Sequence, residues 1–340
     1  NEWKSLYESR SGERGVFSRV ASQRQAEKNG RRDATFDFGT NPCSEIILRP
    51  YQFCNLSEVV VRANDTLESL RLKVRAAAIL GTLQATLTDF RYLRKIWKDN
   101  TEEEALLGVS LTGIMDHPVM SGRKNRADLQ YWLTQLKEEA IETNRVWAKR
   151  LGINVSTAIT AVKPSGTVSQ LVDSASGIHP RYSEQYIRRV RADARDPLCA
   201  VLEAAGVPVE LDVTSSTTKV FSFPIKSPKK AVVATDMGAM EQLDLWEMYQ
   251  DYWCEHKPSM TCYYRDDEFL EVGQWLYNKF DKVSGISFLP YSEHTYQQAP
   301  YEPVDPETYQ SLVNKAFPKA IDWNISEASD MTEGSQQLAC

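Results

Sequence analysis

Residues 39–56 read GTNPCSEIILRPYQFCNL and hold two cysteines, Cys43 and Cys54, that lie eleven positions apart. Cys43 follows a proline and the Gly39-Thr40 break, so we predict that it lies on a loop between strands, where catalytic groups are commonly held. A turn at Arg49-Pro50-Tyr51 allows the chain to fold back, which would bring Cys54 toward Cys43. This stretch therefore predicts a loop that places two thiols at one site.

A carboxylate and an amide accompany the thiols. Glu45 stands two residues after Cys43, so both side chains face the same way on an extended segment, and Asn41 precedes them. The alternative is that both cysteines are ordinary core residues and that Asn-Pro-Cys is a simple turn. A zinc site is not predicted, because neither cysteine belongs to a short Cys-x-x-Cys pair.

Helix and strand signals alternate along the chain and predict an α/β fold with a largely parallel sheet. Helices are expected after the caps at Asp65-Thr66, Thr101, Asp196 and Asp305, over about 129–151, and over about 239–252 and 268–280. Strands are expected at 35–38, 46–48, 158–162, 220–224, 260–264 and 285–289. No linker rich in Gly, Ser or Pro divides the chain.

Composition excludes several classes of protein. The 340 residues are 42% hydrophobic with a net charge of −6, which allows a large core and argues against a dedicated nucleic-acid binder. No apolar run approaches the ~20 residues of a membrane span, and six cysteines are too few for a disulfide scaffold. We therefore expect a cytoplasmic protein that binds neither membrane nor nucleic acid.

A second informative stretch is Lys163-Pro-Ser-Gly-Thr-Val-Ser169. It follows a predicted strand, and its glycine lets backbone N–H groups approach a ligand closely. The residues after Gly166 are expected to open a helix, and a helix N-terminus binds anions. The Gly-Lys-Ser/Thr ending of a Walker loop is absent, and an ordinary turn is the alternative.

Taken together, these motifs resemble those of ribonucleotide reductases. Asn41-Pro-Cys-Ser-Glu45 with Cys54-Asn-Leu56 resembles the active-site finger loop, and its spacing is similar to that of the adenosylcobalamin-dependent (class II) enzymes. The resemblance to the monomeric, triphosphate-using branch continues through further motifs in the same order, at 163–169, 176–180, 186–190, 284–290 and 337–340. It implies the C-terminal half of a ten-stranded α/β barrel with adenosylcobalamin as cofactor, and reduction of ribonucleotides to 2′-deoxyribonucleotides.

The resemblance also implies a role for each matching residue. Cys43 would become the thiyl radical that removes the 3′ hydrogen of the ribose, Glu45 would be the general base on the 3′ hydroxyl, and Asn41 would orient the hydroxyls. Cys54 and a partner cysteine would supply two electrons and end as a disulfide. The substrate phosphates would be bound by Pro164, Ser165, Gly166, Thr167, Val168 and Ser169.

The resemblance further implies two regions and several partners. Residues 1–326 would be the C-terminal part of the catalytic barrel, with its finger loop at 39–56 and its phosphate loop at 163–169. Residues 327–340 would be a flexible, truncated redox arm in which Cys340 relays electrons from an external, thioredoxin-like dithiol. Since family members are longer, we expect an N-terminal half supplied in trans, which would carry the partner of Cys54.

Two alternatives to this function stay open. The chain could be a fragment of a di-iron-dependent, class I-like large subunit, or a non-catalytic nucleotide-binding or assembly half. Of the other cysteines, Cys199, Cys254 and Cys262 are expected in the core. A metal site at Cys254, His256 and Cys262 is the weaker interpretation, and no metal ligand is predicted.

Overall fold

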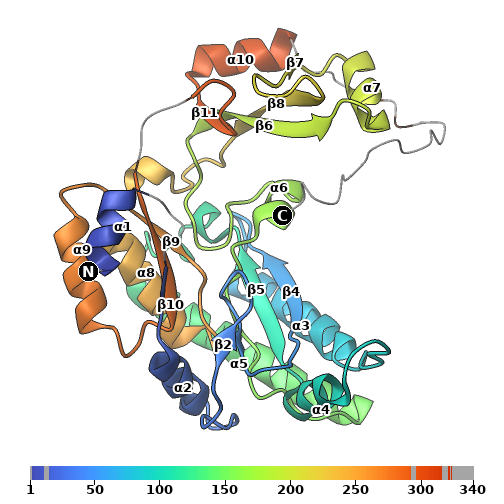
Figure 1. Ribbon diagram of the computed structural model, residues 1–340, viewed down its shortest axis with the longest axis vertical. Helices are drawn as coiled ribbons and strands as arrows, with labels where there is room; N and C mark the ends of the chain where they lie inside the picture. The colour runs from blue at the N-terminus through green and yellow to red at the C-terminus, as the bar shows by residue number, and fades with distance from the viewer. Residues whose placement is uncertain (1, 11–14, 292–295, 316–320, 322, 324–340) are drawn as a thin grey trace. The chain divides into compact units, whose positions relative to one another are not determined.

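The computed structural model describes residues 2–10, 15–291, 296–315, 321 and 323. These residues form two compact units (Figure 1). Unit 1 comprises residues 1–181 and 229–291, and unit 2 comprises residues 182–228 and 292–340, each apart from its undescribed positions. The sequence showed no such division, because the chain enters unit 2 and leaves it again without a linker of distinctive composition.

Unit 1 is built around parallel strands that are continued by single bridges. β4 (Asn55–Val60) pairs in parallel with β5 (Leu107–Thr112), and β10 (Gly285–Pro290) pairs in parallel with β9 (Thr261–Tyr264). Residues 158–162, expected as a strand, form parallel bridges to Val109 on one side and to Pro258 on the other. β1 (Gly15–Phe17) closes the series, antiparallel to β10. The predicted α/β architecture is therefore confirmed.

Helices pack against these strands and bury one core. α3 (Leu67–Gln84) contacts β4, β5 and α5 (Arg126–Leu151), and α8 (Ala239–Tyr252) contacts α5, β9 and α9 (Phe269–Asn278) (Figure 1). The core beneath them includes the fully buried Leu107, Val109, Trp246 and Trp253. The remaining helical elements of unit 1 are α1 (Glu2–Ser9), α2 (Arg19–Lys28), α4 (Lys95–Glu104), η1 (Ile114–Asp116), α6 (Gly166–Leu171) and η2 (Ala234–Asp236).

The helix caps expected from the sequence explain most of the helix boundaries. Thr66 caps α3 in a reciprocal box with Ser69, Gly152 ends α5 in the left-handed region at φ 70°, and Asp196 precedes Pro197 at the start of α7. The cap expected at Thr101 is wrong: Thr101 and Glu104 lie in the last turn of α4. Glu104 is turned inward there, because it pairs with a buried arginine described below.

The strand expected at 35–38 is absent, and several strands were missed, among them two in the core of unit 1. Residues 35–38 form a turn, because the Asp33 carboxylate accepts hydrogen bonds from the Thr35 N–H and hydroxyl. The sequence did not predict β4 or β5. β5 is buried along its whole length, so it carries no alternation that would mark it as a strand.

Unit 2 is a four-stranded antiparallel sheet with two helices. The strand order is β11 (Tyr301–Pro303), β6 (Gln185–Asp193), β8 (Thr218–Lys226) and β7 (Val209–Leu211). α10 (Pro306–Lys315) contacts β6 and β8, and α7 is Pro197–Ala204. Cys199 packs with Leu202, Val207 and Phe221 in a separate small core, as expected for this cysteine.

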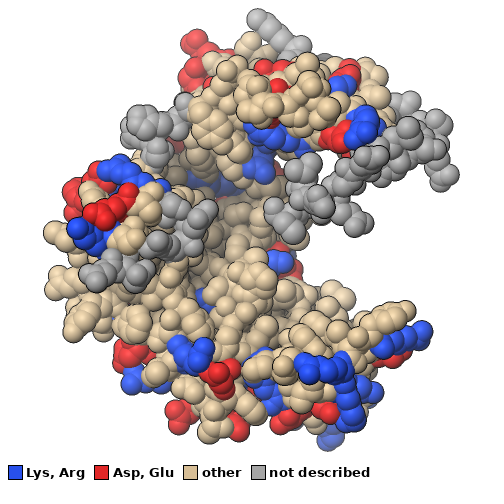
Figure 2. All heavy atoms as spheres, in the orientation of Figure 1, with Lys and Arg blue, Asp and Glu red and all other residues tan. Residues whose placement is uncertain are grey.

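The distribution of surface charge and the character of the helices concern two expectations, that the chain binds neither nucleic acid nor membrane. Lys and Arg side chains are interspersed with Asp and Glu over the part of unit 1 around α4 (Figure 2), so no continuous basic stripe covers that face. Among the described helices, none combines the length and the apolar character that crossing a membrane would require.

Candidate active site

The finger loop is a short β-hairpin. β2 (Gly39–Thr40) and β3 (Ile47–Leu48) pair antiparallel and leave residues 41–46 as its tip. Asn41 closes the tip: its side-chain oxygen accepts from the Ile46 N–H at 3.0 Å, and its carbonyl accepts from the Ser44 N–H at 2.9 Å. The Asn41 amino group takes no part in this closure, so it can still serve a ligand.

Cys43 lies on a loop between two strands, as the sequence predicted, and its side chain is exposed. The Ser259 hydroxyl donates to the Cys43 carbonyl at 2.6 Å and holds the tip against the segment that leads into β9. Burial, together with the nearby Glu45 carboxylate, raises the pKa of the Cys43 thiol. The thiol is therefore protonated at neutral pH, as an S–H donor of a hydrogen atom must be.

A cavity of about 430 Å³ opens beside Cys43. Its walls come from the finger tip, β1, the phosphate loop, the segment before β9, and β10. The lining residues are Gly15, Val16, Phe17, Pro42, Cys43, Ser44, Pro164, Lys257, Ser259, Met260, Thr261, Gly285, Ile286 and Ser287. Two stretches singled out in the sequence, the finger loop and the phosphate loop, thus meet at one cavity.

Glu45 is completely buried, although it lies only two residues from the exposed thiol. Its backbone carbonyl accepts from the Lys257 N–H at 3.3 Å. Neither carboxylate oxygen has a hydrogen-bond partner among the described residues. A buried carboxylate without a partner is costly, and Glu45 is not among the residues that line the cavity beside Cys43.

Cys54 lies just before β4, next to Gly108 on β5. A Cβ at position 108 would come within 2.5 Å of Leu56 Cδ2 and 2.9 Å of Ile46 Cδ1, and within ordinary contact, 3.5 Å, of the Cys54 sulfur. Burial strongly raises the pKa of the Cys54 thiol, and Glu45 raises it further. Glu45 therefore acts electrostatically on both thiols, which agrees with the expected fold-back of this stretch.

The phosphate loop turns sharply at Ser165, which adopts the left-handed region at φ 57° before α6 begins. The Ser165 hydroxyl is buried without a hydrogen-bond partner, and Gly166, Thr167 and Val168 are exposed. Burial raises the pKa of Glu58 on β4, an effect that the Ser165 hydroxyl and Lys163 oppose. The loop thus presents exposed residues next to Pro164, which lines the cavity, and its buried Ser165 hydroxyl lies near Glu58.

Residues 176–180 contact the phosphate loop and hold it in place. The Ser176 hydroxyl donates to the Ser165 carbonyl at 3.1 Å and shares a 2.7 Å hydrogen bond with Ser169. Gly177 has φ 54°, and a Cβ there would lie 2.4 Å from the Lys163 carbonyl. Only glycine fits this approach, so the segment holds the phosphate loop in shape.

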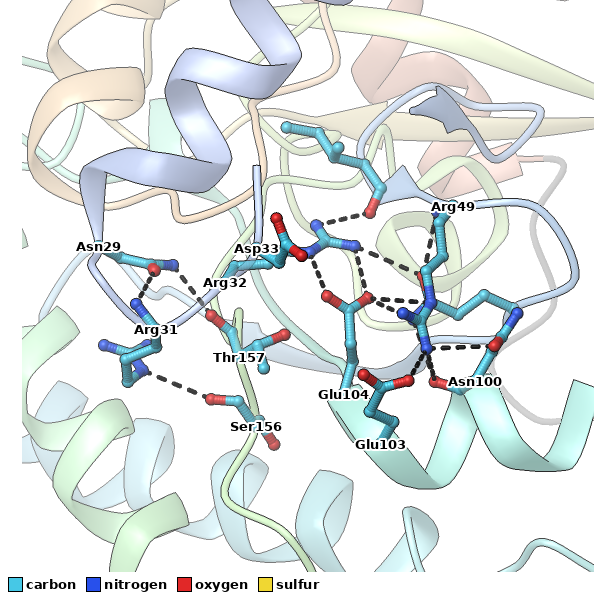
Figure 3. Close-up of polar contacts among 12 residues, drawn as sticks. Asn29, Arg31, Arg32, Asp33, Arg49, Asn100, Glu103, Glu104, Ser156 and Thr157 are labelled. Atoms are coloured by element: carbon cyan, nitrogen blue, oxygen red, sulfur yellow. Dashed lines mark hydrogen bonds and ion pairs between the residues drawn. The ribbon is translucent and has the colours of Figure 1, made fainter. Parts of the chain in front are cut away.

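A buried ion pair anchors the base of the finger hairpin (Figure 3). The Arg32 guanidinium donates to both carboxylate oxygens of Glu104, at 2.9 and 3.0 Å, and to the Ile47 carbonyl at 2.9 Å. Arg49, directly after β3, pairs with Glu103 and donates to Asn100. Since these partners lie on α4, the hairpin is fastened to that helix on its inner side.

His256 fastens the hairpin to β5. The Ile47 N–H donates to Nδ1 at 3.3 Å, and Nε2 donates to the Leu107 carbonyl at 2.9 Å. Both ring nitrogens are therefore used in the neutral ring. Burial and the nearby Arg32 lower the pKa of His256 to about 3. Cys254 and Cys262 are buried in the core, as expected, and the described residues include no cluster with the makings of a metal site.

Acid is expected to destabilise unit 1 through His256. An unfolded histidine binds a proton near pH 6.5 and the folded His256 only near pH 3, so the unfolded state holds more protons between these values. The free energy of unfolding should fall as the pH is lowered through this window. Between pH 6.5 and about pH 5 the expected loss from His256 is about 2 kcal/mol.

Denaturant titrations at several pH values test this expectation. His256→Gln is the matched variant, because an amide can keep both hydrogen bonds without titrating. The variant should lose less stability than the wild-type chain over the same pH range. An equal loss in both proteins would contradict the assignment.

Some site residues could not be predicted from the sequence. Lys257 lines the cavity next to Cys43, but it follows the core helix α8 without any motif, so no signal pointed to it. Cys340 and the expected arm at 327–340 lie outside the described residues. The 186–190 motif lies in β6 of unit 2, and the 284–290 motif falls on β10 at the cavity.

Comparison with known proteins supports the resemblance found in the sequence. An adenosylcobalamin-dependent ribonucleoside-triphosphate reductase of Lactobacillus delbrueckii subsp. bulgaricus is 30% identical over 299 residues, which are 80% of this chain and 40% of that protein. One from Lacticaseibacillus paracasei is 29% identical over 333 residues, 88% of this chain and 44% of that protein. The chain thus spans less than half the length of these relatives. No protein-family model matches it.

Comparison with solved structures also finds ribonucleotide reductases. A crystal structure of a B-12 dependent (class II) ribonucleotide reductase superposes with a TM-score of 0.73 at 27% identity, covering 82% of this chain and 42% of that one. An Actinobacillus ureae class Id ribonucleotide reductase alpha subunit gives a TM-score of 0.58 at 12% identity, covering 86% and 61%. The second likeness shows the fold alone, so the comparisons favour the class II resemblance over the di-iron alternative.

Proposed function

We propose that this chain, which is homologous to the adenosylcobalamin-dependent ribonucleoside-triphosphate reductases, supplies the catalytic half of a reductase that converts ribonucleotides to 2′-deoxyribonucleotides in the cytoplasm. One observation carries the proposal. An exposed thiol, Cys43, stands at a cavity two residues from a fully buried carboxylate, Glu45, that lacks any described partner. A thiol and a base arranged in this way suit hydrogen-atom and proton removal from one sugar.

The residues would divide the reaction between them. Cys43, as a thiyl radical, would take the 3′ hydrogen atom of the ribose, while Glu45 would accept the proton of the 3′ hydroxyl and Asn41 would orient the hydroxyls. The 2′ hydroxyl would leave as water with a proton from a thiol. Cys54 and a partner cysteine would give up two electrons and two protons and close a disulfide.

The cofactor would have to reach Cys43. Adenosylcobalamin would supply the one-electron oxidation of the thiol when bound. The residues present fit this requirement, because the Cys43 thiol is exposed at the wall of the cavity. We propose that the wall formed by β1 and β10 faces the cofactor.

The phosphate loop would bind the charged end of the nucleotide. Pro164 borders the cavity that holds Cys43, and the buried Ser165 hydroxyl has no partner. Gly166, Thr167 and Val168 offer exposed backbone, and Ser169 holds the loop through Ser176. A phosphate bound there would place the ribose of the same molecule toward the thiol.

We further propose that the remaining half of the reductase docks on β4 and α3 of unit 1. No strand in the described part of the chain pairs with the outer edge of β4, and an unpaired parallel edge is unusual. A groove of about 770 Å³ runs along it, between β4 and α3. Leu80, Leu83 and Leu87 line this groove and remain 63%, 41% and 71% exposed. A strand from the partner half, carrying the second cysteine, would cover both features.

The electron supply would come from outside the barrel. We propose that Cys340 passes electrons from a thioredoxin-like dithiol to the disulfide formed by Cys54, by thiol exchange. The chain would then cycle between its dithiol and disulfide forms at each turnover.

The function is tested by hydrogen exchange at C3′. The chain is combined with the N-terminal part of a related reductase, adenosylcobalamin, a dithiol and a ribonucleotide tritiated at C3′. Release of tritium to water and formation of deoxyribonucleotide are the expected results. Nucleotide binding without any exchange would leave only the non-catalytic alternative.

The docking surface makes a separate prediction. Leu80→Lys and Leu83→Lys each put a charge into the groove, so they should weaken assembly with the N-terminal part at least tenfold, the equivalent of about 1.4 kcal/mol. Binding is measured by calorimetry or ultracentrifugation. Leu270→Lys, at an 81% exposed position on α9, is the control and should bind normally. Equal affinity of all three variants would place the interface elsewhere.

A further inference from the structure

Lys257 is a charged side chain buried directly beneath the finger tip. It is 1% exposed, and its ammonium group donates to the Gly285 carbonyl at 3.0 Å. A Cβ on Gly285 would lie 2.4 Å from the Lys257 nitrogen and 3.1 Å from the Ser44 hydroxyl. The ammonium group, Gly285 and the residue between Cys43 and Glu45 therefore meet at one point, and only glycine leaves room for the lysine.

Burying this ammonium group is costly unless a negative charge lies nearby. One carbonyl oxygen does not neutralise a buried cation, which is normally paired in proteins. Glu45 is the matching anion: it is also fully buried, its two oxygens lack described partners, and its backbone is bonded to that of Lys257. The two described side chains form no direct hydrogen bond or ion pair with each other, so Lys257 would act on Glu45 as a buried charge of opposite sign at longer range.

The electrostatics of the pair agree with this pairing. Burial lowers the pKa of Lys257 to about 7, and the Glu45 carboxylate, followed by the Cys254 thiol, opposes the decrease. On its other sides Glu45 faces Cys43, Cys54 and Glu58, and it raises the pKa of all three. Lys163 and Arg32 oppose these increases. Lys257 differs from Lys163 in being fully buried, so its charge is little screened by solvent.

We propose that Lys257 is a positioning residue for Glu45: its buried positive charge favours the carboxylate form that a general base needs. The inference rests on the proposed function for the meaning of the base, but the charge interaction itself concerns this chain alone. Lys257 acts in its protonated form, and the proton of the 3′ hydroxyl goes to Glu45. The lysine contributes charge and position, and it transfers nothing.

Infrared spectroscopy of the intact chain tests the pairing without any substrate. The carboxyl band of Glu45 is isolated as the difference between the wild-type chain and Glu45→Gln. In Lys257→Met, the band of the protonated acid should persist to a pH that is about one to three units higher than in the wild-type chain. Lys137→Met, which removes another largely buried lysine from α5, is the control and should not move the band. An unchanged band in Lys257→Met would overturn the proposal.

Stability provides a second test if Lys257→Met folds poorly. The single variant leaves the Glu45 carboxylate buried with no cation, whereas Glu45→Gln combined with Lys257→Met removes both charges. The double variant should therefore unfold at higher denaturant concentration than Lys257→Met. A double variant no more stable than the single one would show that the two side chains are not coupled, and would overturn the proposal.

The assembled reductase separates this inference from the function on which it rests. In Lys257→Met, the acid limb of the pH profile for 3′ hydrogen exchange should move to higher pH, while the KM for the nucleotide stays the same. A purely structural role would lower the rate at every pH, and that outcome would overturn the proposal. Absence of exchange in the wild-type assembly would refute the proposed function, and the infrared experiment would still decide the pairing.

Discussion

Cys43→Ala is expected to abolish 3′ hydrogen exchange and deoxyribonucleotide formation, with a loss of at least about 1,000-fold. The reason is chemical: S–H and activated C–H bonds have similar strengths, so a sulfur can take the hydrogen atom and later return it. Alanine offers no such atom, and serine in Cys43→Ser has too strong an O–H bond. Both variants should keep the fold, because the side chain is exposed at the hairpin tip and supports no core contact.

The measurement combines activity with binding. Tritium release from C3′ and product formation are followed in the assembled enzyme, and nucleotide affinity is measured separately by calorimetry. Nucleotide affinity should change little in Cys43→Ala, since the phosphate loop is untouched. Cys199→Ala, which removes a thiol from the small core of unit 2, is the control and should retain exchange. Turnover in Cys43→Ala would refute the thiyl assignment.

Arg32→Met is expected to destabilise unit 1 by about 3–5 kcal/mol. Arg32 and Glu104 are both almost fully buried and share two hydrogen bonds, at 2.9 and 3.0 Å. Removing the arginine leaves the buried Glu104 carboxylate with the Gln52 amide as its hydrogen-bond donor and with Arg49 only at 4.0 Å. The same guanidinium holds the Ile47 carbonyl on β3. The finger hairpin should therefore loosen as well, and hydrogen exchange at the amides of residues 40 and 46–48 should accelerate.

Denaturant unfolding and amide hydrogen exchange measure the two effects. Arg145→Met is the control, because Arg145 pairs with Glu142 on the exposed face of α5, where an ion pair is worth about 0–1 kcal/mol. Arg32→Met combined with Glu104→Gln should recover part of the loss, since no bare charge then remains buried. A loss in Arg32→Met as small as that in the control would mean that the pair does not anchor the hairpin.

The finger loop shows how much of a local structure the neighbouring residues can predict. Gly39-Thr40 and Pro42 predicted a loop between strands that carries Cys43, and the described hairpin has that form, with Cys43 exposed at its tip. Hydrogen bonds between residues three to five positions apart close this tip, so its shape is decided within the segment. The burial of Glu45 was not predictable in the same way, because its backbone is bonded to that of Lys257, more than 200 positions away in the chain.

Helix boundaries could be predicted from the sequence more fully than strands, for a similar reason. Caps at Thr66, Asn125 and Asp196 use side chains within three residues of the backbone they serve, and such signals can be read directly. β5 became a strand because β4 and residues 158–162 pair on its two sides, and nothing in its own residues required this. Unit 2 was missed because its two stretches of chain are joined only in space.

By itself, the sequence determined the α/β class, most helix boundaries, the loop position of Cys43 and the resemblance to ribonucleotide reductases. All of these depend on short-range hydrogen bonds or on residue order. The tertiary structure alone decided that Lys257 and Ser44 meet at Gly285, that His256 joins β3 to β5, and that Gly108 makes room for Leu56 and Ile46. The physical reason is that burial and charge pairing arise between segments that meet only after the chain has packed.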